Sequence, residues 1–251
     1  MHDHNPIAGD LPRMRTGGVT AKVYQVGVDE EICGNVPREG GSSEGWAKRT
    51  LINMMKAVRE IEANREDAFL ALTASDIERA KRTGKIAILL GVEGGRLLEG
   101  DLDLLYAFYR LGLRELQLTW VFSNHLVQGG KLTSFGRDVV AECARLGIIV
   151  DTTHLASAAF DELVSVTKRP LIVSHGAAKG VRIDLDDARI KAIAKTGGVI
   201  GLHFYSSYLG TPPTLSALCD HVAYIAKLAG IEHVGLGADF FPTTGVWRDF
   251  Q

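Results

Sequence analysis

The sequence predicts an α/β fold, a (β/α)8 TIM-type barrel that forms a single domain over residues 1–251. Short apolar runs alternate with longer amphipathic stretches, the pattern that βα units with a parallel sheet produce. Several runs are apolar at nearly every position, such as 86–90 and 148–150, as expected of strands that are covered on both faces. A length of 251 residues is also common for one such barrel.

The apolar runs indicate where the strands lie. Seven strands are predicted: Val19–Val28, Lys85–Val92, Glu115–Thr119, Gly147–Thr152, Pro170–Ser174, Gly197–Leu202 and His233–Ala238. An eighth would precede His2, so we expect a barrel that is clipped at its first strand and after its last. The same alternation allows an open doubly wound sheet. We favour closure because polar ligands that are spread over so many strands converge only in a closed sheet.

Amphipathic stretches between these runs indicate helices. Seven are predicted: Gly45–Asn64, Ala74–Thr83, Leu102–Leu111, Phe135–Leu146, Ala158–Thr167, Asp186–Thr196 and Thr214–Leu228. Thr73 or Ser75 is expected to cap the second helix, and Ser134 the fourth, because short hydroxyl side chains bind the exposed N–H groups of a first turn.

Composition and charge exclude several functions. The formal net charge is -2, without the clustered positive charge that a nucleic-acid or polybasic membrane surface needs. No run approaches the ~18–20 apolar residues of a membrane span. The polar N-terminus carries no signal peptide, so a cytoplasmic protein is expected. The three cysteines suggest no disulfide framework, and Cys143 and Cys219 are expected to be small buried hydrophobes.

Acidic and imidazole side chains follow the predicted strands. In a parallel α/β barrel, functional residues come from the carboxyl ends of the strands and the loops after them. The residues at these positions are Glu93, His154, His175 and Asp239, with His2 and His4 after the expected first strand. A single histidine at a strand end is more often a surface or hydrogen-bonded residue. The joint occurrence of so many is what indicates a metal site.

The residue types suit a binuclear zinc site. Residues i and i+2 of a strand point the same way, so His2 and His4 can bind one ion, and a glutamate can bridge two. A bridged pair lowers the pKa of a shared water toward neutrality, and Asp239 could accept the proton and pass it to a leaving amine. We expect His125, His221 and His233 to have structural roles and not to belong to the site. His203 directly follows a strand, which leaves open that it lines the site.

Several segments together resemble one enzyme family. They are 10–19, 91–95, 134–136 with 139–140, 151–154, 173–175 and 235–240. In order and content these segments are similar to the membrane (renal-type) dipeptidases, peptidase family M19 of the amidohydrolase superfamily. The combination of Glu93-Gly94-Gly95 with the two later histidine motifs is specific.

The resemblance implies a residue-by-residue assignment. It implies two zinc ions bridged by Glu93, with His154 and His175 completing the second metal and Asp239 as the acid/base. The first ligand pair of the family is commonly His-x-Asp, so His4 would stand in place of the aspartate. Two further residues concern the dipeptide substrate: Arg182 would hold its carboxylate with a planar guanidinium fork, and Tyr205 would lie near it.

Three features depart from the family pattern. Leu118-Thr119-Trp120 stands where the family has Leu-Thr-His, so a histidine that polarises the scissile carbonyl is replaced, and His125 is a candidate substitute. Phe241-Pro242 replaces Asp-Gly after Asp239-Phe240, and the segment from His175 to Arg182 is short. We expect Trp120 and Asn124 to line the substrate pocket.

Three functions are compatible with these residues. The first is a zinc-dependent dipeptidase that acts on small dipeptides, possesses no membrane span and can form a homodimer. The second is a related binuclear-metal amidohydrolase acting on another amide, a lactone or an ester, which the replacement at Trp120 motivates. The third is a non-catalytic metal-binding barrel, motivated by the same replacement and by the short ends.

Overall fold

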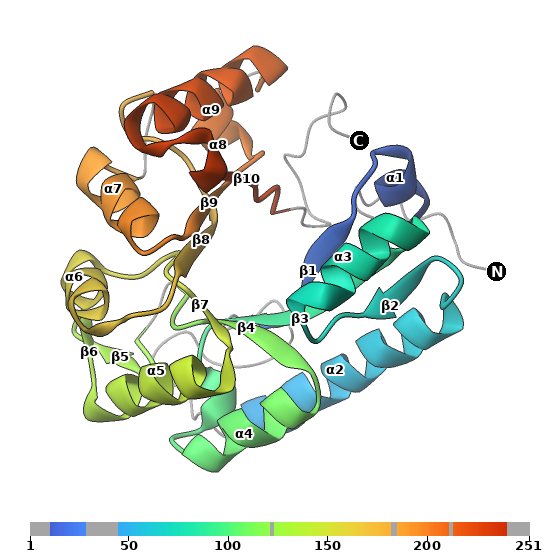
Figure 1. Cartoon of the computed structure of the whole chain (residues 1–251). Coiled ribbons are helices and arrows are strands. Elements are labelled where there is room, and N and C mark those ends of the chain that lie inside the picture. Colours follow the sequence, from blue (N-terminus) through green and yellow to red (C-terminus); the bar gives the residue numbers. More distant parts are fainter. Residues whose placement is uncertain (1–10, 29–44, 121–122, 182–184, 211–212, 240–251) are drawn as a thin grey trace. The chain divides into compact units, whose positions relative to one another are not determined.

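The structure is a computed structural model that describes residues 11–28, 45–120, 123–181, 185–210 and 213–239 (Figure 1). The chain divides into two compact units. The first unit comprises residues 1–18 and 169–251, and the second comprises residues 19–168. Each unit is an α/β structure with parallel strands.

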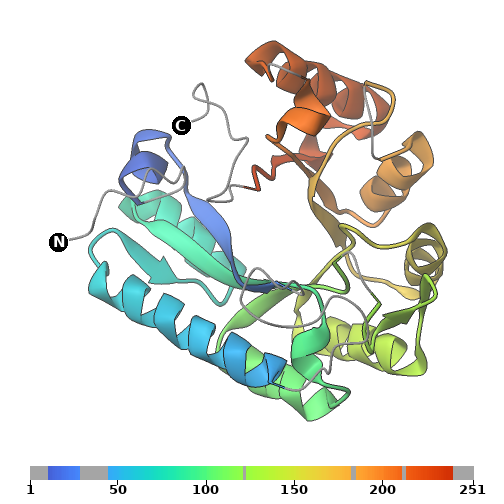
Figure 2. The same cartoon turned by 180° about the vertical axis from the view of Figure 1, so that it is seen from behind.

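The second unit alternates strands and helices. Its strands are β1 (Ala21–Val28), β2 (Ala68–Leu70), β3 (Ile86–Glu93), β4 (Leu113–Gln117), β5 (Val127–Gln128), β6 (Lys131–Leu132) and β7 (Ile149–Asp151). Its helices are α2 (Trp46–Ala63), α3 (Ala74–Thr83), α4 (Leu102–Arg110), α5 (Ser134–Leu146) and α6 (Ser157–Val166). Figure 2, viewed from behind, shows the long helix α2 running beside β2.

The sheet of the second unit aligns three polar residues. β1, β3, β4 and β7 pair in that order, all parallel, and β2 pairs with the first part of β3. In this register Glu93 is the partner of Gln117, and Gln117 is the partner of Asp151. Each of the three is the last residue of its strand, so they form one row along the carboxyl edge of the sheet.

Helix α3 packs on this sheet through small side chains. Ala71, Ala80 and Ala87 are fully buried together, and Phe69 and Leu89 pack against them. The helix begins at a capping box in which the Asp76 carboxylate accepts the backbone N–H of Thr73 at 2.9 Å. Of the two caps that the sequence allowed, Thr73 and Ser75, the structure has Thr73.

The first unit contains α1 and the C-terminal strands. Its elements are α1 (Leu11–Thr16), β8 (Leu171–Gly176), α7 (Asp187–Lys195), β9 (Val199–Leu202), α8 (Ser206–Leu209), α9 (Leu215–Ala229) and β10 (Val234–Leu236). β9 lies between β8 and β10, and all three are parallel. Their carboxyl ends therefore meet at one edge, from which the polar residues that follow them project.

Two glycines allow the strand ends of this unit to approach closely. A Cβ on Gly201 would lie 2.0 Å from the carbonyl oxygen of Ser174, and one on Gly237 would lie 1.8 Å from the same atom. No side chain fits at either position without moving the backbone. The chain leaving β10 toward Asp239 thus passes directly over β8.

All seven predicted strands and all seven predicted helices are confirmed within a few residues. Short elements were not predicted: α1, α8, β2 and the hairpin of β5 and β6. Two finer expectations were wrong. Thr133, not Ser134, caps α5, because its hydroxyl accepts the N–H of Gly136 at 2.9 Å. Cys219 is exposed, since it lies on the outer side of α9, whereas Cys143 is buried and burial raises its pKa to about 12.

In the described part of the chain, no helix combines the length and the apolar character that crossing a bilayer demands.

Candidate metal centre

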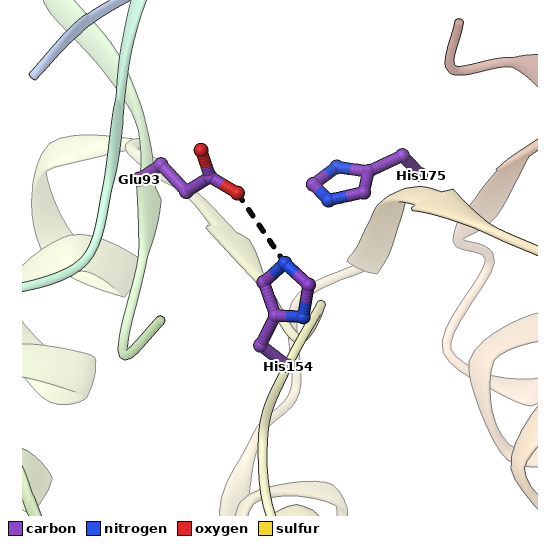
Figure 3. A group of neighbouring side chains, drawn as sticks. All are labelled: Glu93, His154 and His175. Carbon is purple, nitrogen blue, oxygen red and sulfur yellow. Dashed lines mark ion pairs between the residues drawn. The ribbon is translucent and has the colours of Figure 1, made fainter. Parts of the chain in front are cut away.

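Glu93 and His154 form the polar centre of the second unit. Glu93 is the last residue of β3, and His154 follows β7 by three residues. Their atoms Oε1 and Nε2 are 3.4 Å apart, and their side chains are 12% and 30% exposed, respectively (Figure 3). Carboxylate and imidazole are the donors that zinc prefers beside thiolate. This pair of converging donors, open to solvent on one side, therefore fits a divalent metal.

The backbone of His154 is held in an unusual conformation. Its φ is 62°, in the left-handed region that residues other than glycine rarely adopt. The preceding turn is tied to the strand end, because Asp151 Oδ1 accepts the N–H of Thr153 at 3.0 Å and its hydroxyl at 2.7 Å. Strain of this kind persists where surrounding bonds fix it, often at functional sites. The bonds between Asp151 and Thr153 thus fix the turn from which the His154 side chain projects.

Replacing Thr153 with valine is expected to weaken this turn while keeping its shape. The variant loses the buried hydroxyl bond to Asp151, so the free energy of unfolding should fall by about 1–2 kcal/mol. Zinc affinity, measured by competition with a chromophoric chelator, should fall roughly tenfold or more, as for other residues that orient a ligand. The control is Thr83→Val, at the end of α3. Unchanged zinc affinity in Thr153→Val would contradict a positioning role.

A buried carboxyl group, that of Glu115, lies on β4 two residues before the strand-end residue Gln117. Glu115 is fully buried and accepts an amide N–H from Gln25 at 2.9 Å. Burial, and next the negative charge of Asp151, raise the pKa of Glu115 well above its usual value. The folded protein therefore favours the protonated form of the Glu115 side chain.

The raised pKa of Glu115 predicts a pH-dependent stability. The folded protein holds the Glu115 proton more tightly than the unfolded chain, so the stabilisation is complete below the usual pKa of 4.5. It declines as the pH rises from there toward the folded pKa, by about 1.4 kcal/mol per pH unit. Glu115→Gln, which is neutral at every pH, should therefore gain stability relative to the parent between pH 5 and pH 7. Urea unfolding of the metal-free proteins measures this, and a pH-independent difference would contradict it.

The loop after β4 contributes one residue that contacts His154, and another whose side chain hydrogen-bonds to the loop backbone. The Trp120 ring lies edge-on to the His154 ring, with centroids 6.3 Å apart. The Asn124 amide is engaged by the backbone: it accepts the N–H groups of Leu126 and Val127 and donates to the carbonyl of Leu118. The substrate contact expected of Asn124 stays a prediction. His125 is exposed and lies close to Gly100.

The first unit brings together His175, His203 and Asp239. One donor atom of each lies within 4.8 Å of the others. His203 Nε2 is 3.1 Å from Asp239 Oδ2, and the rings of His175 and His203 are edge-to-face at 5.3 Å. His175 Nδ1 is 2.9 Å from the hydroxyl of Ser174. Two imidazoles and a carboxylate are again a donor set that borderline divalent metals accept. His175, also drawn in Figure 3, therefore belongs to a second group of donors.

Sequence analysis left the role of His203 open. The structure groups this residue with two predicted site residues, His175 and Asp239. The signal was positional: His203, like His154 and His175, lies at the carboxyl end of a strand. His221 and His233 are structural, as predicted: His221 Nδ1 accepts the N–H of Ala178, and His233 Nδ1 is 2.7 Å from the carbonyl of Gly198.

Three predicted site residues, His2, His4 and Arg182, lie outside the described residues, as do Phe241 and Pro242. Tyr205 is described, and its ring is tilted against that of His203 at 5.9 Å.

The model of one protein family, "Membrane dipeptidase (Peptidase family M19)", matches residues 1–250 of the chain. The chain belongs to the M19 dipeptidase family. It is accordingly a metallo-dipeptidase, a hydrolase of peptide bonds. The resemblance seen in the sequence motifs is thereby confirmed over the whole chain.

Solved structures agree with membership of the M19 family. A metallo peptidase from Rhodobacter sphaeroides, liganded with a phosphinate mimic of the dipeptide L-Ala-D-Ala, is 25% identical with a TM-score of 0.85, over 98% of this chain and 80% of that one. A dipeptidase AC of family M19 is 26% identical with a TM-score of 0.85, over 98% and 79%. An amidohydrolase from Pseudomonas aeruginosa is 27% identical with a TM-score of 0.78, over 94% and 71%.

Proposed function

We propose that this M19 dipeptidase depends on zinc and binds two ions per chain, bridged by Glu93. His2 and His4 would hold one ion, and His154 and His175 the other. The observation that carries the proposal is the convergence of Glu93 Oε1 and His154 Nε2 to 3.4 Å from the ends of two strands. A glutamate with two oxygens is the residue in this set that can reach two ions at once.

The chemistry divides between the metals and the side chains. Bound zinc would supply a water of lowered pKa and polarise the scissile carbonyl. Asp239, after β10, would accept the proton of the attacking water and deliver it to the leaving amine. Its backbone φ of 51° is again left-handed, which supports a residue held in place for function. The guanidinium of Arg182 would hold the substrate carboxylate.

The pocket around this centre would be lined by Tyr205, Trp120 and Asn124. We propose that the fold is one closed (β/α)8 barrel, in which His2 and His4 lie at the same edge as the other ligands. A homodimer is compatible with this arrangement.

A panel of substrates tests the proposed function. Zinc-loaded protein should hydrolyse dipeptides, and the panel should include dipeptides with a D-residue at the C-terminal side, because the Rhodobacter sphaeroides relative binds a mimic of L-Ala-D-Ala. Tripeptides and N-acetylated, C-amidated dipeptides serve as controls, since Arg182 would no longer meet a correctly placed carboxylate. Equal rates on the amidated and free dipeptides would contradict the substrate assignment.

The second candidate is hydrolysis of another amide, a lactone or an ester at the same metal centre. It is favoured by Trp120, whose indole lies edge-on to His154 where the family resemblance places a histidine. An indole N–H is a neutral donor and polarises a carbonyl less than a charged imidazolium does, and an ester or lactone needs less polarisation than an amide. Turnover of lactones with none of dipeptides would support this candidate over the first.

A further inference from the structure

His203 is a buried histidine that contacts an exposed carboxylate. Its side chain is 7% exposed and that of Asp239 is 40% exposed, and Nε2 and Oδ2 are 3.1 Å apart. This distance is that of a hydrogen bond. Whether the imidazole donates to Asp239 or binds a cation with it depends on which ring nitrogen carries the proton.

The backbone settles which nitrogen carries the proton. His203 Nδ1 lies 3.0 Å from the N–H of Tyr205, and a backbone N–H can only donate. Nδ1 is therefore an acceptor. The neutral ring then carries its proton on Nε2, which faces Asp239 and donates to Oδ2.

The ring is fixed on both sides. It stacks on Tyr208 with centroids 4.5 Å apart and an interplanar angle of 20°, and meets His175 edge-to-face. Tyr208 is itself held, because its carbonyl oxygen is 3.3 Å from Nε2 of the buried His221. A rotation of the His203 ring away from Asp239 would break this stack and the bond from Tyr205.

The same geometry disfavours His203 as a metal ligand. A cation on Nε2 would displace the proton there, and the neutral ring would then carry it on Nδ1. The N–H of Tyr205 points at Nδ1, so two donors would face each other at 3.0 Å. His175, whose Nδ1 meets a hydroxyl that can accept or donate, has no such conflict.

We propose that His203 is a positioning residue for Asp239: its Nε2–H holds one carboxylate oxygen and fixes the direction in which Asp239 meets the attacking water. The role rests on the proposed function, in which Asp239 moves the proton. Asp239 has a left-handed backbone and follows Gly237, which passes tightly over Ser174. An exposed carboxylate on such a segment needs a side-chain bond to keep one orientation.

Two variants of His203 and one control test this role. His203→Phe keeps the stack on Tyr208 and removes the donor, so kcat on a dipeptide should fall about 10- to 100-fold, the usual effect of losing a supporting bond. KM and zinc content should stay at parent values. His203→Gln places an amide N–H near Nε2 and should restore most of kcat. His233→Phe, a control at the opposite end of the adjacent strand β10, should leave kcat unchanged.

The possible results lead to different conclusions. A parent-like kcat in His203→Phe, or no recovery in a folded His203→Gln, overturns the positioning role. Loss of zinc in both variants also overturns it and makes His203 a ligand. A zinc-loaded parent inactive on every dipeptide refutes the proposed function instead. In that case ¹⁵N NMR of the histidine rings still decides, since a zinc-loaded protein with His203 protonated on Nδ1 contradicts donation from Nε2.

Discussion

Glu93→Ala is expected to remove dipeptidase activity almost entirely, with kcat/KM falling roughly 1,000-fold or more, because it takes away the ligand proposed to bridge both metals. Zinc content of the dialysed protein should fall with it. The fold should persist, since the β3 backbone keeps its parallel partners β1 and β4. Turnover of a dipeptide and metal analysis of the same preparation measure both effects.

The matched control for this variant is Glu99→Ala. Glu99 follows Glu93 on the same segment, and its carboxylate accepts the N–H of Ala47 at the start of α2. Its loss should change stability slightly and leave zinc content and kcat intact. Full activity in Glu93→Ala would remove the basis for the metal centre.

Asp239→Asn is expected to separate catalysis from metal binding. An amide of the same shape cannot take a proton from water, so kcat should fall about 100- to 10,000-fold, the usual contribution of a general acid or base. KM for the dipeptide should change little, because Asp239 is not assigned to substrate binding. The rate and zinc content are measured at saturating zinc to exclude a metal-binding defect.

Asp220→Asn provides the comparison for this charge change, as Asp220 lies on the exposed surface of α9 in the same unit. It should leave kcat unaltered. A kcat for Asp239→Asn within a fewfold of the parent would mean that another group carries the proton.

The fold was predictable because its main elements have strong local signals. β3 is buried along almost its whole length, so its apolar run stands out, and Thr73 with Asp76 marks the start of α3. β5 and β6 have two residues each, too few for any period to appear. Such short pairs are specified by the turn and by tertiary packing.

The candidate site was predictable where strand ends carry residues that can bind a metal, and less so where interacting residues come from distant segments. Glu93, His154 and His175 follow from position alone. Glu115 looked like part of a strand, and only the pairing of β4 with β7 shows that its carboxyl feels the charge of Asp151. The role of His203 depends on one backbone N–H, that of Tyr205, which no spacing in the sequence encodes.

Zinc titration of the stripped enzyme tests the metal-dependent dipeptidase most directly. The chain is treated with a chelator, dialysed and titrated with zinc while hydrolysis of L-Ala-D-Ala and L-Ala-L-Ala is followed. We expect no turnover without metal and a rise that saturates near two zinc ions per chain, as a bridged pair requires. Turnover that persists in the metal-free protein, or saturated zinc sites with no hydrolysis of any dipeptide, would contradict the proposal.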